Sequence, residues 1–478
     1  MRVLVVGLAV TGEAVARHCT AAGDTVVVIE DHPGVASDWA ERVAGTRSLG
    51  ATVLERPDPG RAAELAVEAD LVVPSPGVPE RHPAIAAARV AAVPVRSEID
   101  LAGDVLAGDV LGIDVLRSEV LRSEVWADRG APALIAVTGT NGKTSVTTLT
   151  AAILEAAGLR VAAAGNIGRP LLDAVHDDVD VVVAEVSSFQ LAFTERFRPD
   201  AAALLNLGSD HLDWHRTFDA YAHAKANLFA HQRVDDLLVF NADDPVVAGL
   251  AADAPGRRVS FSIAPGAANG YRVAHTATGH LLVTPDGDEI VAVTELGRSR
   301  PPDLANALAA CALALDVVDD PVLGIVAARR ALADFGGLAH RMQVVAERDG
   351  VRFVDDSKAT NVHATIAAVR GLDGVVLLAG GRNKGLDLGD LRVLAPALRG
   401  VVAIGEAASE VRDAFAGSVT VVNAPSMKEA VRAASDLARR GDTVLLSPGC
   451  ASFDWYSSYA ERGDDFAREV QSHVGVET

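Results

Sequence analysis

One short run of this chain reads as a strand, a glycine turn and the start of a helix: Val137-Thr138-Gly139-Thr140-Asn141-Gly142-Lys143-Thr144-Ser145. The apolar stretch 133–137 precedes it, and a helical pattern over 146–157 follows it. A loop of this kind cradles phosphates, because backbone N–H groups face the anion, the lysine reaches the outer phosphates and the next hydroxyl can hold Mg²⁺. The centre of the chain is therefore predicted to be α/β.

The loop departs from the general phosphate-loop pattern, since the glycine expected five residues before Gly142 is Val137. This departure points away from generic phosphate-loop proteins. The alternative is a glycine turn that only starts a helix.

Length, net charge and cysteine content limit the classes of protein to which this chain can belong. A length of 478 residues suggests about three domains. The net charge of −21 argues against nucleic acid as a partner. Three widely spaced cysteines have no metal-ligand spacing and favour reduced thiols, hence a cytoplasmic protein. The chain opens directly into a strand without a signal-peptide pattern, and it has no apolar run of roughly 18 residues, so no membrane span is expected.

Strand-like and helix-like patterns alternate along the chain, which is typical of α/β domains with mostly parallel sheets. In the first block, strands at 3–6, 26–29 and 71–73 surround the run Gly7-Leu8-Ala9-Val10-Thr11-Gly12. This run resembles the start of a Rossmann fold with alanine at the second glycine. A tight strand–helix turn without a ligand fits equally well.

We predict domains at 1–129, 130–337 and 338–478: a Rossmann-like domain, a central ATPase of phosphate-loop type, and a second Rossmann-like domain. Strands at 351–354, 375–379, 401–404 and 443–446 support the third. Short tandem repeats fill 101–129, where Leu-Ala-Gly-Asp-Val and Val-Leu-Arg-Ser-Glu each occur twice. We interpret them as a duplicated surface insertion, part helix and part linker.

Several polar side chains of the central block follow strands. Glu185 ends an apolar strand where a nucleotide-bound Mg²⁺ needs a carboxylate, or else it faces water. Asp210 and His211 lie on a loop after the strand 202–205, a place suited to metal or substrate contacts. By pattern alone, Lys225 is a solvated helix lysine over 221–229, and Asn306 caps or packs an alanine-rich helix.

Three polar loops follow strands of the third block: Asp355-Asp356-Ser357-Lys358-Ala359-Thr360-Asn361, Gly380-Gly381-Arg382-Asn383-Lys384-Gly385 and Ser447-Pro448-Gly449-Cys450-Ala451-Ser452-Phe453-Asp454. Loops at the carboxyl ends of parallel strands converge on one crevice. Their lysines and hydroxyls suggest a small acidic substrate. Each loop taken alone could be only a polar turn.

Motifs along the whole chain resemble the Mur ligases, in the order of that family. The motifs are the loop 138–144, Gly165-Asn166-Ile167-Gly168, Glu185-Val186-Ser187-Ser188-Phe189-Gln190-Leu191, Asp210-His211-Leu212-Asp213, His340-Arg341 and the 356–361 string. The 356–361 and 447–454 strings resemble the member of the family that adds D-glutamate.

The resemblance implies ATP-dependent addition of D-glutamate to UDP-N-acetylmuramoyl-L-alanine through an acyl phosphate, with ATP and two Mg²⁺ ions, in a cytoplasmic monomer. The metals would be held by Thr144, Glu185, His211 and Lys225. The catalytic residues would be Lys143, His211 and Lys225, the last as a carbamate, because a cationic lysine would repel Mg²⁺.

The resemblance also implies the binding residues. ATP would contact Gly139, Thr140, Asn141, Gly142, Lys143, Thr144, Ser145, Asn306, Arg341 and Asp356. The UDP-sugar would contact Val10, Thr11, Glu30, Asp31, His32, Ser75, Gly77, Asn166 and His211. D-Glutamate would contact Lys358, Thr360, Lys384, Ser452, Phe453 and Tyr459.

Two positions depart from the family pattern: Pro302-Asp303 stands where His-Asn is frequent, and Glu30-Asp31-His32 where Asp-Thr-Arg is frequent. The alternatives are a sister ligase for another amino acid, a folylpolyglutamate synthase, or a non-catalytic nucleotide sensor. The 356–361 string argues against the first two. The joint presence of Lys143, Thr144, Glu185, His211 and Lys225 argues against a sensor.

Overall fold

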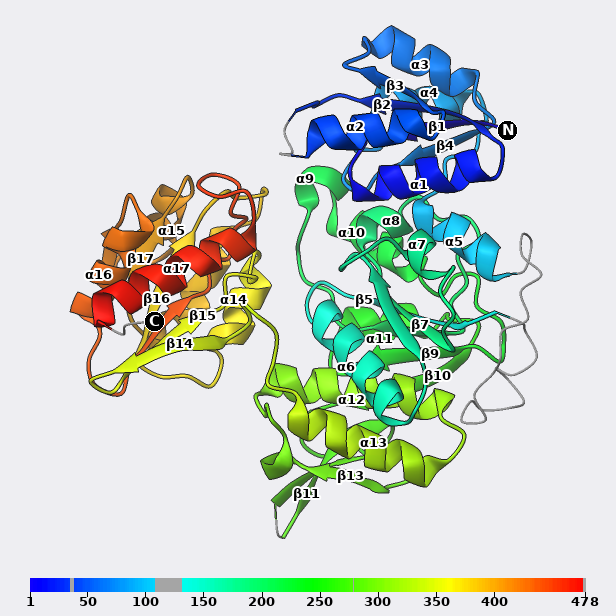
Figure 1. Cartoon of the computed structure of the whole chain (residues 1–478). Helices are drawn as coiled ribbons and strands as arrows, with labels where there is room; N and C mark the ends of the chain where they lie inside the picture. Colours follow the sequence, from blue (N-terminus) through cyan, green and yellow to red (C-terminus); the bar gives the residue numbers. More distant parts are fainter. Residues whose placement is uncertain (35–37, 108–130, 278, 476–478) are drawn as a thin grey trace. The chain divides into compact units, whose positions relative to one another are not determined.

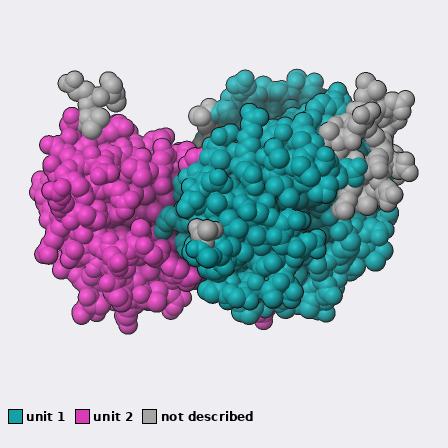
Figure 2. All heavy atoms as spheres, turned by 90° about the horizontal axis from the view of Figure 1, so that it is seen from below, with its two compact units in different colours: residues 1–207, 222–335 teal, residues 208–221, 336–478 magenta. Residues whose placement is uncertain are grey.

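The computed structural model describes residues 1–34, 38–107, 131–277 and 279–475 and contains three sheets (Figure 1). Most of the 101–129 repeat segment therefore lies outside the described residues. The chain forms two compact units, unit 1 from 1–207 and 222–335, and unit 2 from 208–221 and 336–478 (Figure 2). The α/β prediction is confirmed.

The first sheet of unit 1 has the order β3-β2-β1-β4 and is parallel throughout. Its strands are β1 (Arg2–Val6), β2 (Thr25–Glu30), β3 (Thr52–Glu55) and β4 (Leu71–Pro74), with helices α1 (Val10–Ala21), α2 (Trp39–Ser48), α3 (Pro59–Val67) and α4 (Pro83–Val90). Strand β3, which is short and lies at the sheet edge, was not predicted from the sequence.

The second sheet of unit 1 has the order β13-β12-β11-β10-β9-β8-β5-β7-β6. Its strands are β5 (Ala133–Thr138), β6 (Val161–Gly165), β7 (Val181–Glu185), β8 (Ala201–Leu204), β9 (Leu237–Asn241), β10 (Arg257–Ser262), β11 (Tyr271–Thr276), β12 (Gly279–Val283) and β13 (Glu289–Ala292). The strands from β5 to β11 in this sheet pair in parallel, and β12 and β13 extend the sheet as antiparallel strands.

The helices around this sheet are α6 (Lys143–Ala156), α7 (Leu171–Ala174), α8 (Ser188–Leu191), α11 (Pro245–Ala251), α12 (Pro301–Val317) and α13 (Pro321–Asp334), while α10 (Phe218–Ala226) begins in unit 2. Buried side chains of β5, α6, α12 and α13 share one core. This core fixes β5 and α6, and with them the loop that joins them.

Helix α5 (Glu98–Leu106) follows the first sheet and is docked by two buried carboxylates. Glu98 accepts the backbone N–H of Leu172 at 2.6 Å and lies 3.5 Å from Gln190 Nε2. Asp100 accepts the N–H groups of residues 195 and 196. Burial raises the pKa of Glu98 to about 7.

Unit 2 contains a sheet of order β14-β15-β19-β16-β17-β18. Its strands are β14 (Gln343–Arg348), β15 (Val351–Asp355), β16 (Val375–Gly380), β17 (Leu398–Ile404), β18 (Val421–Asn423) and β19 (Thr443–Leu446). Only β14 pairs antiparallel within it. Two strands were not predicted from the sequence: β14, an exposed edge strand, and β18, which has three residues.

The helices of unit 2 are α9 (Leu212–His215), α14 (Val362–Val369), α15 (Ala408–Ala414), α16 (Met427–Leu437) and α17 (Tyr459–Val474), with a 3₁₀ segment at Leu388–Ala397. Alternate residues of β16 face different cores. Leu377 packs in the core of α14 and α15, and Leu378 packs in the core of α16 and α17. Both faces of the sheet are covered, as parallel sheets require.

Among the described residues, no helix is both long and apolar enough to cross a lipid bilayer. The predicted domain boundaries stay a prediction.

Candidate active site

The predicted phosphate loop joins the fully buried strand β5 to the N-terminus of α6. Gly142 has φ +88° at the N-cap of α6, and a Cβ there would lie 2.5 Å from Asn306 Oδ1. Only glycine fits this left-handed position at so close an approach. Asn306 is the sixth residue of α12, so it does not cap that helix but lies against the loop.

A second asparagine, to which the sequence analysis gave no role, fixes the loop from the end of β8. Asn206 accepts the N–H of Asn141 through Oδ1 at 2.8 Å and donates to the Asn141 carbonyl at 2.9 Å. Its own carbonyl accepts the N–H of Thr140. Its position one residue beyond the predicted strand 202–205 was the available signal.

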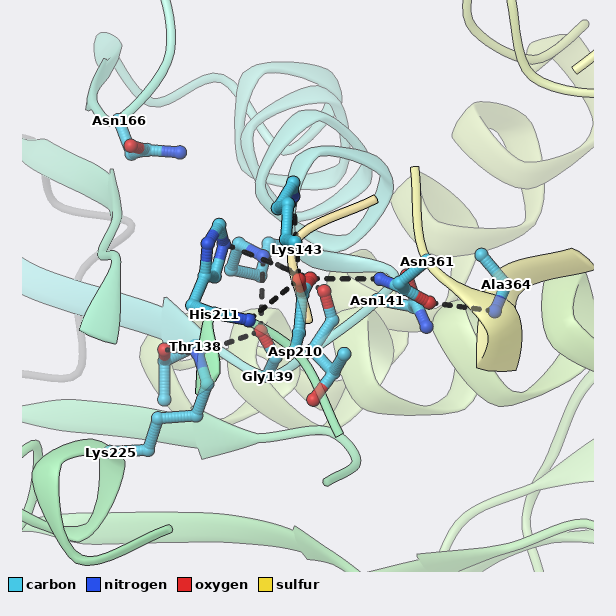
Figure 3. Close-up of polar contacts among 12 residues, drawn as sticks. Thr138, Gly139, Asn141, Lys143, Asn166, Asp210, His211, Lys225, Asn361 and Ala364 are labelled. Carbon is cyan, nitrogen blue, oxygen red and sulfur yellow. Dashed lines mark hydrogen bonds and ion pairs between the residues drawn. The ribbon is translucent and has the colours of Figure 1, made fainter. Parts of the chain in front are cut away.

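Two lysines of unit 1 contact the loop. Lys143 Nζ donates to the carbonyls of Gly139 and Thr140 at 3.0 and 3.1 Å. Lys225, on α10, is 1% exposed and donates to the Gly139 carbonyl at 2.9 Å and to Thr138 Oγ1 at 3.2 Å (Figure 3). The pattern-based interpretation of Lys225 as a solvated helix lysine is therefore wrong, because α10 packs this face against the loop.

Glu185 is 2% exposed at the end of β7, in register with Val137 of β5. The interpretation of this residue as an acid facing water is thus wrong. Its Oε1 accepts from Asn166 Nδ2 at 2.8 Å, and its Oε2 is buried without a hydrogen-bond partner in the described part of the chain. A buried carboxylate oxygen of this kind is unfavourable unless a cation or donor satisfies it, so the position suits a Mg²⁺ ligand.

Within the described ranges, no group of three or more His, Cys, Asp or Glu side chains is arranged to hold a metal ion. The predicted donor set is of mixed chemistry: besides Glu185 it comprises the Thr144 hydroxyl in the first turn of α6, His211 and Lys225.

A narrow hollow of about 10 Å³, the space of roughly one water molecule, lies beside the start of α6. Its lining combines apolar and polar side chains: Ser145, Leu149, Leu296, Arg298, Asp303, Asn306, Ala307, Leu332 and Phe335. Asp303, which departs from the family pattern, accepts from Arg298 at 3.1 Å and from the Arg300 N–H at 3.3 Å. Its carboxylate therefore caps α12 and fixes the wall of this hollow.

The predicted UDP-sugar residues of the first sheet gather at the carboxyl ends of its strands. Val10 and Thr11 open α1, and Ser75 Oγ donates to the Gly7 carbonyl at 2.8 Å. Glu30 accepts the N–H of Leu8 at 2.7 Å and that of His32 at 2.8 Å. Asp31 pairs with His82 at 2.9 Å, and Gly77 has φ +94°. Glu30 thus stabilises the glycine turn itself.

In unit 2, Asp356 follows β15 and is 6% exposed. It accepts from Ser447 Oγ at 2.8 Å and from the Met342 N–H at 3.2 Å. Burial raises the pKa of Asp356 to about 7, although the nearby Arg341 guanidinium opposes the change.

The predicted D-glutamate residues also lie in unit 2. Lys358 Nζ is 5.1 Å from the ring centroid of Tyr459, and Lys384 Nζ is 3.4 Å from Asp210 Oδ1. Thr360 is partly buried, Ser452 is buried, and Phe453 is 60% exposed.

A buried arginine that the sequence analysis did not consider ties these loops together. Arg462, on α17, donates to the carbonyls of Ser357 and Cys450 and to Ser357 Oγ at 2.8 to 3.1 Å. Burial lowers its pKa to about 10.

Asp210 and His211 belong to the 208–221 segment of unit 2. His211 has φ +52° at the N-cap of α9, and Asp210 Oδ1 accepts its N–H at 2.9 Å. The assigned roles of all these residues toward ligands stay predictions.

Comparison with known proteins adds an independent line of evidence. Residues 137–314 match the family model of the Mur ligase middle domain, and residues 340–450 match that of the Mur ligase glutamate ligase domain. A UDP-N-acetylmuramoylalanine–D-glutamate ligase of Frankia casuarinae is 42% identical, with 99% of this chain and 94% of the relative covered. A protein of the same name from Methylobacillus flagellatus is 40% identical, with 90% of each covered.

Among solved structures, MurF ligase from Thermotoga maritima in complex with ADP has a TM-score of 0.56 at 16% identity, covering 99% of this chain and 95% of that one. At this level of identity, the similarity shows that the two proteins share a fold and nothing more specific.

Proposed function

Because the chain belongs to the Mur ligase family, we propose that it is the ATP-dependent ligase that joins D-glutamate to UDP-N-acetylmuramoyl-L-alanine in peptidoglycan precursor synthesis. The observation that carries the choice of amino acid is the 42% identity, over 99% of this chain, to a relative named for D-glutamate. The 356–361 string agrees with that choice.

The reaction has two covalent steps. The alanine carboxylate of the UDP-sugar attacks the γ-phosphorus of ATP, so that an acyl phosphate forms and ADP leaves. The amine of D-glutamate then attacks the acyl carbon, a C–N bond forms, phosphate leaves, and the amine loses its proton to a base.

The loop of unit 1 would bind the nucleotide. The loop N–H groups and Lys143 would hold the β- and γ-phosphates, and Asn306, which lies against the loop at Gly142, would also contact ATP. Bound Mg²⁺ would neutralise phosphate charge, with Thr144 and Glu185 as ligands of one ion and His211 and carbamylated Lys225 as ligands of a second. The unpartnered Glu185 Oε2 supports the first assignment.

Burial of Lys225 against the Thr138 and Gly139 oxygens supports a role at the phosphates. A lysine in such a position carries a charge of the wrong sign for a metal site, and carbamylation would reverse that sign.

In unit 2, D-glutamate would lie among Lys358, Thr360, Lys384, Ser452 and Phe453, with Tyr459 beneath Lys358. Arg341 and Asp356 would contact ATP. The residues at the ends of β1, β2 and β4, together with Asn166, would hold the UDP-sugar. We also propose a cytoplasmic monomer, to which the three free, buried cysteines are suited.

Phosphate release from ATP would test this function. The assay contains UDP-N-acetylmuramoyl-L-alanine and receives D-glutamate, L-glutamate, L-alanine or meso-diaminopimelate in turn. We expect release with D-glutamate alone. Release with another amino acid would make the chain a sister ligase, and no release with any of the four would favour a nucleotide sensor.

A further inference from the structure

Asn361 ends the 356–361 string, and the proposed function gives it no role. The side chain is 3% exposed. Its Oδ1 accepts the N–H of Ala364 at 2.8 Å, which makes it the N-cap of α14. Its Nδ2 donates to Asp210 Oδ2 at 2.9 Å (Figure 3). One amide therefore joins the start of α14 to the 208–221 segment, within unit 2.

Asp210 connects this amide to two predicted site residues. It is 5% exposed, and its Oδ1 accepts the N–H of His211 at 2.9 Å and lies 3.4 Å from Lys384 Nζ. Its Oδ2 receives the Asn361 bond and is 3.7 Å from His211 Nε2. The carboxylate thus bridges the predicted metal ligand and a predicted D-glutamate ligand.

The backbone of His211 needs this support. A residue other than glycine is disfavoured at φ +52°, and the Asp210 carboxylate stabilises that conformation by accepting its N–H. The segment also lies tightly against α14, since a Cβ on Gly208 would be 3.0 Å from the His363 ring. The position of His211 within unit 2 is therefore set by α14 and the loops around it.

We propose that Asn361 is a positioning residue that, through Asp210, couples the metal ligand His211 to the amino-acid-binding loops. The proposal rests on the proposed function for the roles of His211, Thr360 and Lys384. A substrate carboxylate at Lys384 changes the charge beside Asp210, and Asp210 orients His211. Binding of the amino acid and placement of the metal ligand are thus linked through one buried hydrogen bond.

Substitutions that reverse the direction of the hydrogen bond between Asn361 and Asp210 test this coupling. Asn361→Asp keeps the cap of α14, because a carboxylate accepts the Ala364 N–H, but it places two carboxylates together. Asp210→Asn removes the charge of the partner. The double variant Asp210→Asn with Asn361→Asp restores a donor–acceptor pair in the opposite direction. All four proteins are assayed for kcat and for KM of D-glutamate and of the UDP-sugar.

We expect Asn361→Asp to lower kcat/KM for D-glutamate roughly tenfold or more, since adjacent like charges are strongly unfavourable. The KM of the UDP-sugar should change little. The double variant should recover most of the loss. If the effects of the two single changes on kcat/KM for D-glutamate simply add in the double variant, the proposal is overturned. An Asn361→Asp variant with the wild-type kcat/KM for D-glutamate would overturn it as well.

Ser426→Ala is the matched control, because Ser426 caps α16 in the same unit by accepting the Glu429 N–H at 3.3 Å. Loss of this cap should lower the thermal midpoint without changing the KM of D-glutamate. If the wild-type protein fails to turn over D-glutamate, the proposed function fails. In that case the thermal unfolding midpoints of the same four proteins test the interaction between residues 210 and 361. If the midpoint changes of the two single variants simply add in the double variant, the proposed coupling is overturned.

Discussion

Replacing Glu98 by Gln should remove a pH dependence from the stability of unit 1. Glu98 is 1% exposed on α5, and burial raises its pKa from 4.5 to about 7. Between these values the native state keeps a proton that the unfolded chain has lost. Stability from this group is therefore fully present below pH 4.5 and is lost as the pH rises through about 7.

The size of the effect follows from the pKa values. One pH unit corresponds to about 1.4 kcal/mol, so the change from 4.5 to about 7 corresponds to about 3 kcal/mol in the free energy of unfolding. Glutamine does not titrate, and its amide oxygen can still accept the Leu172 N–H. The variant should therefore gain stability relative to wild type as the pH rises.

The assay is urea unfolding followed by circular dichroism at several pH values from 5.5 to 8, which stays above the sequence pI of about 5.0. The free-energy difference between variant and wild type should change by about 2 kcal/mol across this range. Glu64→Gln, at an exposed position on α3, controls for the loss of one negative charge. A difference for Glu98→Gln that stays constant with pH would refute the reasoning.

Three further substitutions give separate tests. Lys225→Ala should nearly abolish turnover, and activity close to wild type would remove the carbamate assignment. Gly142→Ala should weaken ATP binding at least about tenfold in a titration, because its φ of +88° and the nearby Asn306 both oppose a side chain; unchanged affinity would contradict the geometry of the loop. Arg462→Met should lower the free energy of unfolding of unit 2 by about 3 kcal/mol, since it leaves the buried Ser357 and Cys450 carbonyls without their donor; an unchanged unfolding midpoint would show that these bonds contribute nothing.

Periodicity predicted several buried strands, because β5, β7, β16 and β19 are short apolar runs that end in turn residues. It missed β3, β14 and β18, which lie at sheet edges where side chains are mixed and the pattern is weak. In the second sheet, β6 and the strands from β9 to β13 were likewise not predicted, although β9 and β10 are interior strands. Pairing of these strands is decided by tertiary packing more than by local sequence.

The candidate site was also predicted only in part. The loop 138–144 could be predicted from the sequence, because its glycines stand where the local backbone conformation requires them. The burial of Lys225 and Glu185 could not be predicted, since each depends on a neighbouring element that packs against the loop. Asn206, Glu98 and Arg462 act through backbone groups far away in sequence. The end of a predicted strand marks Asn206, but no local pattern marks Glu98 or Arg462.

The interleaved course of the chain has a consequence for dissecting the protein. Unit 2 takes up residues 208–221 before the chain returns to unit 1, so the backbone passes between the units at 207–208, 221–222 and 335–336. A fragment that begins at residue 336 would lack the buried Asp210 and Tyr221 side chains. After cleavage near residue 336 alone, the C-terminal piece would still pack against the 208–221 segment of the other piece. A soluble, independent unit 2 would therefore require grafting 208–221 onto the fragment, as in a circular permutation.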